Sequence, residues 1–381
     1  MDSPIDSGVS FRIQGPVISS ASTFVYVSSA EDGDIGTYTL RPDGSLLPGA
    51  RVEAGKRVMP MAVSPDKRFL VAAVRSEPFS ALTYAIDRLS GALSLVGRGP
   101  LAESLPCISL DRTGRFLFGA SYRGNLVSVN RVGRGGRVGK PIQVVPTARN
   151  AHAICVDNTN RYVFAPHLGT DQVLQFVFDR KSGRLKANTP PLLQLAPGTG
   201  PRQIVVSPDN RFAYLLSELV GTVSTLALDG RTGLLGLVGT ESLLPPGSRL
   251  VPGMPRRGFD VPGADPSPRD ASNDIWASDL HLTPDGRLLY ALERTGSTIT
   301  GFRVQRATGR LAYLASVPTE RQPRGFAIDP SGRFVVVAGE KSELLSSYAI
   351  DRSSGALALV GRYATGKGSN WVEIVSFERR H

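Results

Sequence analysis

One eighteen-residue pattern recurs along the chain and constrains its fold strongly. Its clearest copy is Pro201–Glu218, PRQIVVSPDNRFAYLLSE, with an arginine near the middle. Six copies share this repeat arginine, namely Arg68, Arg115, Arg161, Arg211, Arg287 and Arg333. Their spacings are 47, 46, 50, 76 and 46 residues. A period in the forties with strand-like content is typical of propeller blades.

Each copy predicts four antiparallel strands. An apolar run ends five residues before the repeat arginine, a turn of Pro, Asp, Asn and Gly follows, and a second apolar run comes directly after, as in a hairpin. Further along, paired runs flank Asp-x-x-Ser/Thr-Gly, as in YAIDRLSGAL and FVFDRKSGRL. The glycine suits the left-handed position of a hairpin loop. The unit therefore reads as one four-stranded blade.

The two ends of the chain supply a seventh blade. Thr23–Val27 and Tyr38–Leu46 match the second to fourth strands of a unit, whereas Asn370–Phe377 matches a first strand with nothing after it. A blade shared by both ends closes the ring and leaves no long open edge. We therefore predict an all-β, seven-bladed β-propeller, with residues 1–22 as a flexible leader and residues 23–381 as a single domain.

One segment departs from the period. Glu241–Asn273 accounts for the long spacing between Arg211 and Arg287, and it is rich in proline without any hydrophobic periodicity. Such a segment predicts a long loop between blades, either a lid over one face or a mobile insertion.

Charge and hydropathy narrow the choice of partners. The net charge of +11 comes mostly from arginines spread over the turns, not from a basic run with interleaved aromatics, so we predict no nucleic-acid binding. An arginine-rich surface and a small anionic ligand are the two remaining explanations. Apolar stretches are short and the first residues lack the features of a signal peptide, which predicts a cytoplasmic protein without membrane contact.

The repeat is mostly apolar, but polar residues recur at two of its positions. The start of the innermost strand and the end of the next strand lie on the same face of a propeller, so we expect their side chains to meet at the mouth of the central channel. The candidates at these positions are His152, Arg202, Arg324, Glu218, Arg294, Arg75 and Tyr122. Strand ends are often polar simply because they are solvated. Several arginines in one funnel nevertheless repel each other, and an anionic substrate is the simplest reason to gather them.

Familiar catalytic and cofactor motifs are absent from the sequence. There is no G-x-S-x-G, H-E-x-x-H or C-x-x-C, and the glycine-rich run Gly133–Pro141 has Pro141 where a phosphate-binding loop needs Ser or Thr. With only four histidines, we predict neither a metal site nor a cofactor. We expect Trp276 and Trp371 to be packing anchors, His281 to lie in the core and His167 to lie at the rim or in the packing.

Four segments resemble a known family. GPRQIVVSPDNRFAYLLSEL, PMAVSPDKRFLVAAVR, WASDLHLTPDGRLLYALERTGSTI and QPRGFAIDPSGRF are similar to the bacterial seven-bladed 6-phosphogluconolactonases, which are cytoplasmic enzymes of the pentose phosphate pathway. The likeness extends from about Thr23 to Val375. It implies a metal-independent lactonase whose active-site residues fall on His152, Arg202, Glu218 and Arg294. His167 stands where the family often has Asp, and the 241–273 insertion is longer than in close bacterial relatives.

The residue types fit the hydrolysis of 6-phospho-D-glucono-1,5-lactone. Opening a δ-lactone with water needs a base, a donor for the oxyanion and an anchor for the phosphate. We expect His152 to be the base, Arg202 or Arg294 to face the oxyanion, and Arg324 or Arg75 to hold the phosphate. Glu218 would orient an arginine or the histidine.

Two alternatives remain open at this stage. A cycloisomerase that makes lactones from muconates would use the same cationic funnel for carboxylates, and a non-catalytic propeller would bind a protein or peptide on this face. For the lactonase we expect a small anionic sugar lactone as the only partner, and a monomer or weak homo-oligomer.

Overall fold

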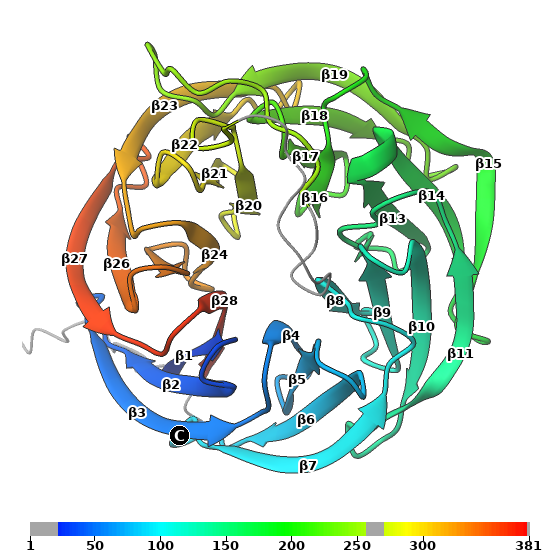
Figure 1. Ribbon diagram of the computed structural model, residues 1–381, viewed down its shortest axis with the longest axis vertical. Coiled ribbons are helices and arrows are strands. Elements are labelled where there is room, and N and C mark those ends of the chain that lie inside the picture. Colours follow the sequence, from blue (N-terminus) through cyan, green and yellow to red (C-terminus); the bar gives the residue numbers. More distant parts are fainter. Residues whose placement is uncertain (1–21, 257–269, 379–381) are drawn as a thin grey trace, which may run out of the picture.

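The computed structural model describes residues 22–256 and 270–378 and arranges them as a ring of seven four-stranded sheets (Figure 1). In each sheet the innermost strand lies at the centre of the ring and the outermost at its rim. We call the sheets blades 1 to 7 in chain order. The seven-bladed β-propeller predicted from the repeat is confirmed.

The strands of blades 1 to 4 are given from the centre outward. Blade 1 consists of β28 (Ser369–Phe377), β1 (Ser22–Ser29), β2 (Asp34–Leu40) and β3 (Leu46–Glu53). Blade 2 consists of β4 (Val58–Val63), β5 (Phe69–Val74), β6 (Ser80–Ile86) and β7 (Leu93–Pro100). Blade 3 consists of β8 (Cys107–Leu110), β9 (Phe116–Ser121), β10 (Leu126–Val132) and β11 (Val138–Pro146). Blade 4 consists of β12 (Cys155–Val156), β13 (Tyr162–His167), β14 (Gln172–Asp179) and β15 (Arg184–Gln194).

Blades 5 to 7 follow the same order. Blade 5 consists of β16 (Pro201–Val206), β17 (Phe212–Ser217), β18 (Thr222–Leu228) and β19 (Leu235–Ser242). Blade 6 consists of β20 (Ala277–Leu282), β21 (Leu288–Glu293), β22 (Thr298–Val304) and β23 (Leu311–Pro318). Blade 7 consists of β24 (Pro323–Ile328), β25 (Phe334–Gly339), β26 (Leu344–Ile350) and β27 (Leu357–Ala364).

Both ends of the described chain meet in blade 1. β28 pairs antiparallel with β1, and the hydroxyls of Thr23 and Ser376 lie 2.8 Å apart across the two strands. The sharing of one blade by the first and last strands, predicted from the orphan runs at the ends of the sequence, is therefore confirmed (Figure 1).

The hydrophobic core lies between the blades. Seven apolar clusters occur among the described residues, one at each interface between adjacent blades. Phe24 and Tyr26 of blade 1, for example, pack against Leu70 of blade 2. Because apolar residues of one blade are buried by the next, no blade has a complete core of its own.

The two sequence motifs of the repeat meet at these interfaces. The glycine of each outer hairpin turn rests against the residue that follows the repeat arginine of the preceding blade, or its counterpart in blade 1. These pairs are Gly44 with Phe334, Gly91 with Phe24, Gly136 with Phe69, Gly183 with Phe116, Gly233 with Tyr162, Gly309 with Phe212 and Gly355 with Leu288. At Gly136 φ is 78°, and an added Cβ would lie 2.7 Å from the Phe69 ring. A side chain is therefore excluded there both by conformation and by space.

The repeat arginines add a polar tie at the same interfaces. Arg68 donates to the Arg134 carbonyl at 3.2 Å, and Arg115 donates to the Arg180 carbonyl at 2.7 Å, each carbonyl lying in the outer hairpin of the next blade. Each of these guanidinium groups also lies over its own following phenylalanine, at 5.0 and 5.6 Å from the ring centroid. The recurrence of this arginine thus has a structural cause.

The described part of the chain contains little besides strands. Its only helical element is the 3₁₀ turn η1 (Leu168–Thr170), so no described helix has the length or hydrophobicity to cross a membrane. The predicted leader, residues 1–22, lies outside the described residues apart from Ser22, with which β1 begins. Residues 257–269 of the predicted insertion also lie outside them, and its first two residues, Glu241 and Ser242, belong to β19.

We expect removal of residues 370–381 to destabilise the whole ring. The deletion takes away nearly all of β28, which exposes the edge of β1 and the apolar faces that β28 covers. The truncated protein should be insoluble or melt well below the full-length chain in a thermal unfolding experiment. As a complementary variant, the oxidised disulfide of T23C/S376C should raise the melting temperature, and reduction should reverse the gain. Equal melting of the truncated and full-length proteins would contradict closure by β28.

Candidate active site

A small cavity lies at the end of the ring where innermost strands begin and second strands end. Its volume is about 50 Å³. The lining residues are Arg75, Pro106, Tyr122, His152, Arg202, Glu218, Arg256, Trp276, Arg294 and Arg324. All seven residues selected from the repeat positions line this one cavity. Their chemical roles stay predictions.

Two innermost strands present their arginines to the cavity through a local irregularity. The pairing register of β16 with β17 skips Arg202, and that of β24 with β25 skips Arg324. A residue left out of the ladder in this way re-aims its side chain, as in a β-bulge. His152 comes just before the short strand β12, and its backbone N–H donates to the Pro166 carbonyl at 3.0 Å. The irregular pairing thus re-aims the side chains of Arg202 and Arg324.

Glu218 joins two of the arginines. Its Oε2 accepts from Nε of Arg202 at 2.6 Å and from Nη2 of Arg294 at 3.3 Å, and all three side chains are buried. Two guanidinium groups on one carboxylate leave an excess of one positive charge. Burial and the neighbouring Arg202 lower the pKa of Arg294 well below its usual range. A bound anion would relieve both effects.

Arg324 and Arg75 complete the cationic wall. Nε of Arg324 lies 3.9 Å from Oε1 of Glu340, and burial lowers the pKa of Arg324 to about 10, so it stays charged at neutral pH. Nε of Arg75 donates to the Ser104 hydroxyl at 2.9 Å. Both side chains are buried.

His152 is held in its neutral form. Burial lowers its pKa well below 6.5, and the charges of Arg202, Arg324, Arg294 and Arg75 lower it further. Its Nδ1 is buried and has no hydrogen-bond partner among the described residues. A neutral imidazole with an unused nitrogen at a cavity is suited to accept a proton from a bound molecule.

Two residues at the cavity were not selected as site residues from the sequence. The indole of Trp276, expected to be a packing anchor, has the guanidinium carbons of Arg294 and Arg256 at 3.6 and 3.9 Å from its centroid. Arg256 belongs to the 241–273 insertion, and its carbonyl accepts from the Tyr122 hydroxyl at 2.8 Å. The Tyr122 ring stands edge-on to His152, with centroids 5.8 Å apart. Because Arg256 lies outside the repeat, its place at the cavity could not be predicted from the spacing of the repeat.

The remaining histidine predictions have different outcomes. His167 is fully buried, and its Nδ1 lies 2.8 Å from the Ala165 carbonyl, which confirms a packing role. Burial lowers its pKa to about 4. The prediction of a core position for His281 is wrong, because its side chain is 36 % exposed and its Nε2 pairs with Asp279 at 3.2 Å.

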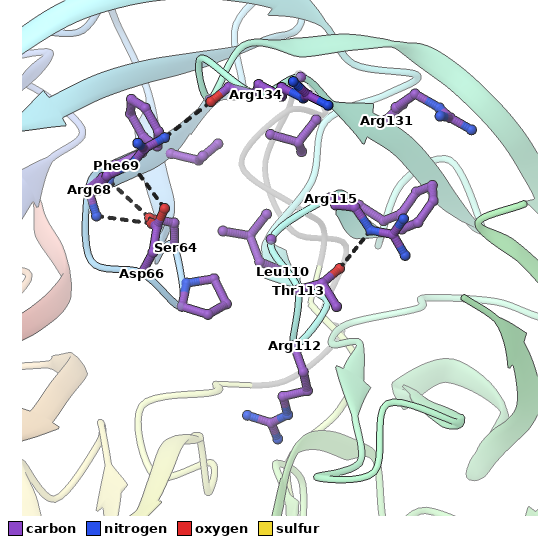
Figure 2. A pocket seen from close by; sticks show the side chains of 17 residues that line it. Ser64, Asp66, Arg68, Phe69, Leu110, Arg112, Thr113, Arg115, Arg131 and Arg134 are labelled. Atoms are coloured by element: carbon purple, nitrogen blue, oxygen red, sulfur yellow. Dashed lines mark hydrogen bonds and ion pairs between the residues drawn. The ribbon is translucent and has the colours of Figure 1, made fainter. Parts of the chain in front are cut away.

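A larger cavity lies at the opposite end of the blades, among the turns of blades 2 and 3 (Figure 2). Its volume is about 1010 Å³, and several arginines line it. These side chains are exposed, and Arg68 and Arg115 bind backbone carbonyls in the inter-blade ties described above. No histidine lines this cavity among the described residues. We therefore place the chemistry at the small buried cavity.

Residues 24–374 match the family model described as "Lactonase, 7-bladed beta-propeller". The chain belongs to this family and is a lactone-hydrolysing enzyme.

Individual relatives show which lactonases this chain is similar to. A 6-phosphogluconolactonase of Cronobacter sakazakii is 39 % identical over 93 % of this chain and 98 % of its own length. A 6-phosphogluconolactonase of Serratia proteamaculans is 37 % identical over 92 % of this chain and 98 % of its own length. Among solved structures, the periplasmic gluconolactonase PpgL of Pseudomonas aeruginosa is 27 % identical with a TM-score of 0.80, covering 93 % of this chain and 99 % of that one.

The lowered pKa of His152 predicts how activity depends on pH. A base works in its neutral form, so activity should persist as pH falls through 6.5 and decline only where His152 becomes protonated. Arg324→Gln removes one repelling charge, which should raise the His152 pKa and move the acid limb of kcat/KM to higher pH. The measurement uses unphosphorylated glucono-1,5-lactone, so that no substrate phosphate titrates. An unchanged acid limb in the variant would exclude His152 as the titrating base.

Proposed function

We propose that this protein hydrolyses 6-phospho-D-glucono-1,5-lactone to 6-phosphogluconate. The observation that carries the proposal is a neutral, buried histidine with a free Nδ1 inside a wall of buried arginines. Two relatives with nearly full coverage bear the name 6-phosphogluconolactonase, which supports this substrate. A phosphorylated substrate cannot readily cross a bilayer, so a cytoplasmic location is part of the proposal.

In the proposed reaction His152 activates the water. Its unpaired imidazole nitrogen takes a proton while the water oxygen forms a bond to the lactone carbonyl carbon. When the tetrahedral intermediate collapses, the bond from that carbon to the ring oxygen breaks. The protonated His152 then returns its proton to the ring oxygen, which becomes a hydroxyl, and a carboxylic acid is left that ionises in water. Atoms and protons balance without a cofactor.

Arg202 and Arg294 are the proposed oxyanion donors. They share Glu218, so the three groups together carry one positive charge. This charge matches the single negative charge that develops on the carbonyl oxygen in the transition state. Glu218 fixes both guanidinium groups in advance, so little reorganisation is needed at the moment of reaction.

Arg324 and Arg75 are the proposed binding residues for the substrate phosphate. Both are buried at the same cavity as His152, and a guanidinium fork suits two phosphate oxygens. Tyr122 contributes a wall beside His152. We propose a monomer or weak homo-oligomer as the working form.

A second candidate substrate is unphosphorylated gluconolactone. The solved relative of Pseudomonas aeruginosa is a periplasmic gluconolactonase. The two candidates differ only in the phosphate, so the ratio of kcat/KM for the two lactones decides between them. Conversion of a muconate with no lactone hydrolysis above background would instead favour the cycloisomerase.

Replacement of His152 tests the proposed base. We expect His152→Ala to lower turnover by roughly 10²–10⁴-fold, as for the loss of a general base. The melting temperature should change little, because Nδ1 makes no hydrogen bond within the described part of the chain. Rates are measured above spontaneous hydrolysis in the same buffer. His281→Ala serves as the matched control and should keep its activity, and similar rates in both variants would remove His152 from the mechanism.

Removal of metal ions tests the predicted independence from metals. Dialysis against a chelator should leave lactone hydrolysis unchanged, because the proposed steps use only a histidine and arginines. Activity that disappears with the chelator and returns with calcium or zinc would overturn the assignment of these residues.

A further inference from the structure

Arg256 reaches the cavity from outside the repeat. The chain before it is bound to the ring by backbone hydrogen bonds. The Gly253 N–H donates to the Leu219 carbonyl at 2.8 Å, and Val251 forms a bridge with Asp274. Leu219 directly follows the site residue Glu218. The first part of the insertion is thereby anchored beside the cavity, and Arg256 lies three residues after Gly253.

The guanidinium group of Arg256 is weakly held. Among the described residues its only hydrogen bond is one of 3.4 Å from Nη2 to the Ala271 carbonyl, and none of them offers it a carboxylate partner. Its other contact is the indole of Trp276, 3.9 Å from guanidinium carbon to ring centroid. Nε of Arg202, by contrast, is fixed on Glu218 at 2.6 Å. The positive charge of Arg256 is therefore available to a ligand.

The size of the cavity points to movement of this side chain. Small-molecule sites usually enclose about 300–1,000 Å³, whereas this cavity encloses about 50 Å³. A wall side chain that can shift would let the cavity admit more of a lactone. Arg256 is half-buried, is attached by a flexible side chain and is bound through one long hydrogen bond, so it is easier to displace than Arg202 or Arg294.

We propose that Arg256 is a substrate-binding residue that leaves the Trp276 ring and binds the phosphate group of the lactone, so that the insertion sets the preference for a phosphate monoester. This inference rests on the proposed function. The Arg202–Glu218–Arg294 group has a charge of +1, which the oxyanion matches. A phosphate dianion requires further cations. Arg324 and Arg75, proposed above for the phosphate, lie at the same cavity, but Glu340 lies 3.9 Å from Arg324. Arg256 adds a positive charge that no carboxylate among the described residues neutralises.

Kinetics with two lactones test the proposal in the full-length chain. Arg256→Ala should raise KM for 6-phosphogluconolactone by about 10–100-fold, as for the loss of a hydrogen bond to a charged group. The kinetics of glucono-1,5-lactone should change by less than about threefold, since it has no phosphate to lose. Arg256→Lys keeps the positive charge but lacks the planar guanidinium group, so its KM for 6-phosphogluconolactone should lie between those of Arg256→Ala and wild type. Arg249→Ala is the matched control, an exposed arginine of the same insertion, and should behave as wild type.

Direct binding separates this proposal from the proposed function. Titration calorimetry with 6-phosphogluconate should show about 10–100-fold weaker binding to Arg256→Ala, whether or not the protein is catalytically active. In a Trp371→Phe background Trp276 is the only tryptophan, and its emission should change when 6-phosphogluconate binds but not in Arg256→Ala.

Each other outcome has a definite meaning. If wild-type protein hydrolyses neither lactone but Arg256→Ala weakens the binding of 6-phosphogluconate, the proposed function is wrong and the proposed role of Arg256 in phosphate binding is supported. If hydrolysis is normal and Arg256→Ala changes neither the preference nor the affinity, the proposed role of Arg256 is wrong. An equal loss on both lactones with a lower melting temperature would show that Arg256 only supports the insertion.

Discussion

The structure depends on one contact that is repeated between neighbouring blades. A turn glycine of each blade lies against the residue after the repeat arginine of the blade before it, or its counterpart in blade 1, at all seven interfaces. Because no blade buries its apolar residues alone, this contact and the cluster beside it fix how far each blade is rotated about the ring. The positions of the innermost strands follow, and with them the distances between side chains from blades 2 to 7 at the cavity. The active site is therefore a product of the interfaces.

Arginine has two separate uses in this molecule. At the far end of the blades, exposed arginines such as Arg68 bind carbonyls and cover aromatic rings, where they stabilise blade contacts. At the cavity, buried arginines such as Arg202 pair with carboxylates. A net charge of +11 combines both uses, so it gives no measure of ligand binding by itself. Burial distinguishes the two groups.

The repeat made much of the site predictable, because equivalent positions in a ring must converge. His152, Arg202 and Arg324 share one position, and Glu218 and Arg294 share another, so their common cavity follows from the period alone. Features outside the period were missed. Arg256 comes from the insertion, and its contact with Trp276 could not be read from the repeat. His281 was misassigned because the spacing of the repeat shows neither its pairing with Asp279 nor the exposure of its side chain. Which arginines share Glu218 depends on side-chain geometry that spacing does not contain.

The shared blade also affects the order in which the chain is completed during synthesis. β1 (Ser22–Ser29) is synthesised long before its partner β28 (Ser369–Phe377). At about 5–20 residues per second, the intervening chain takes roughly 20–70 s to translate. For that time the edge of β1 has no native partner, although the blades between can already pack on one another. A nascent chain of this kind therefore carries a pairing-competent strand edge until β28 has been made.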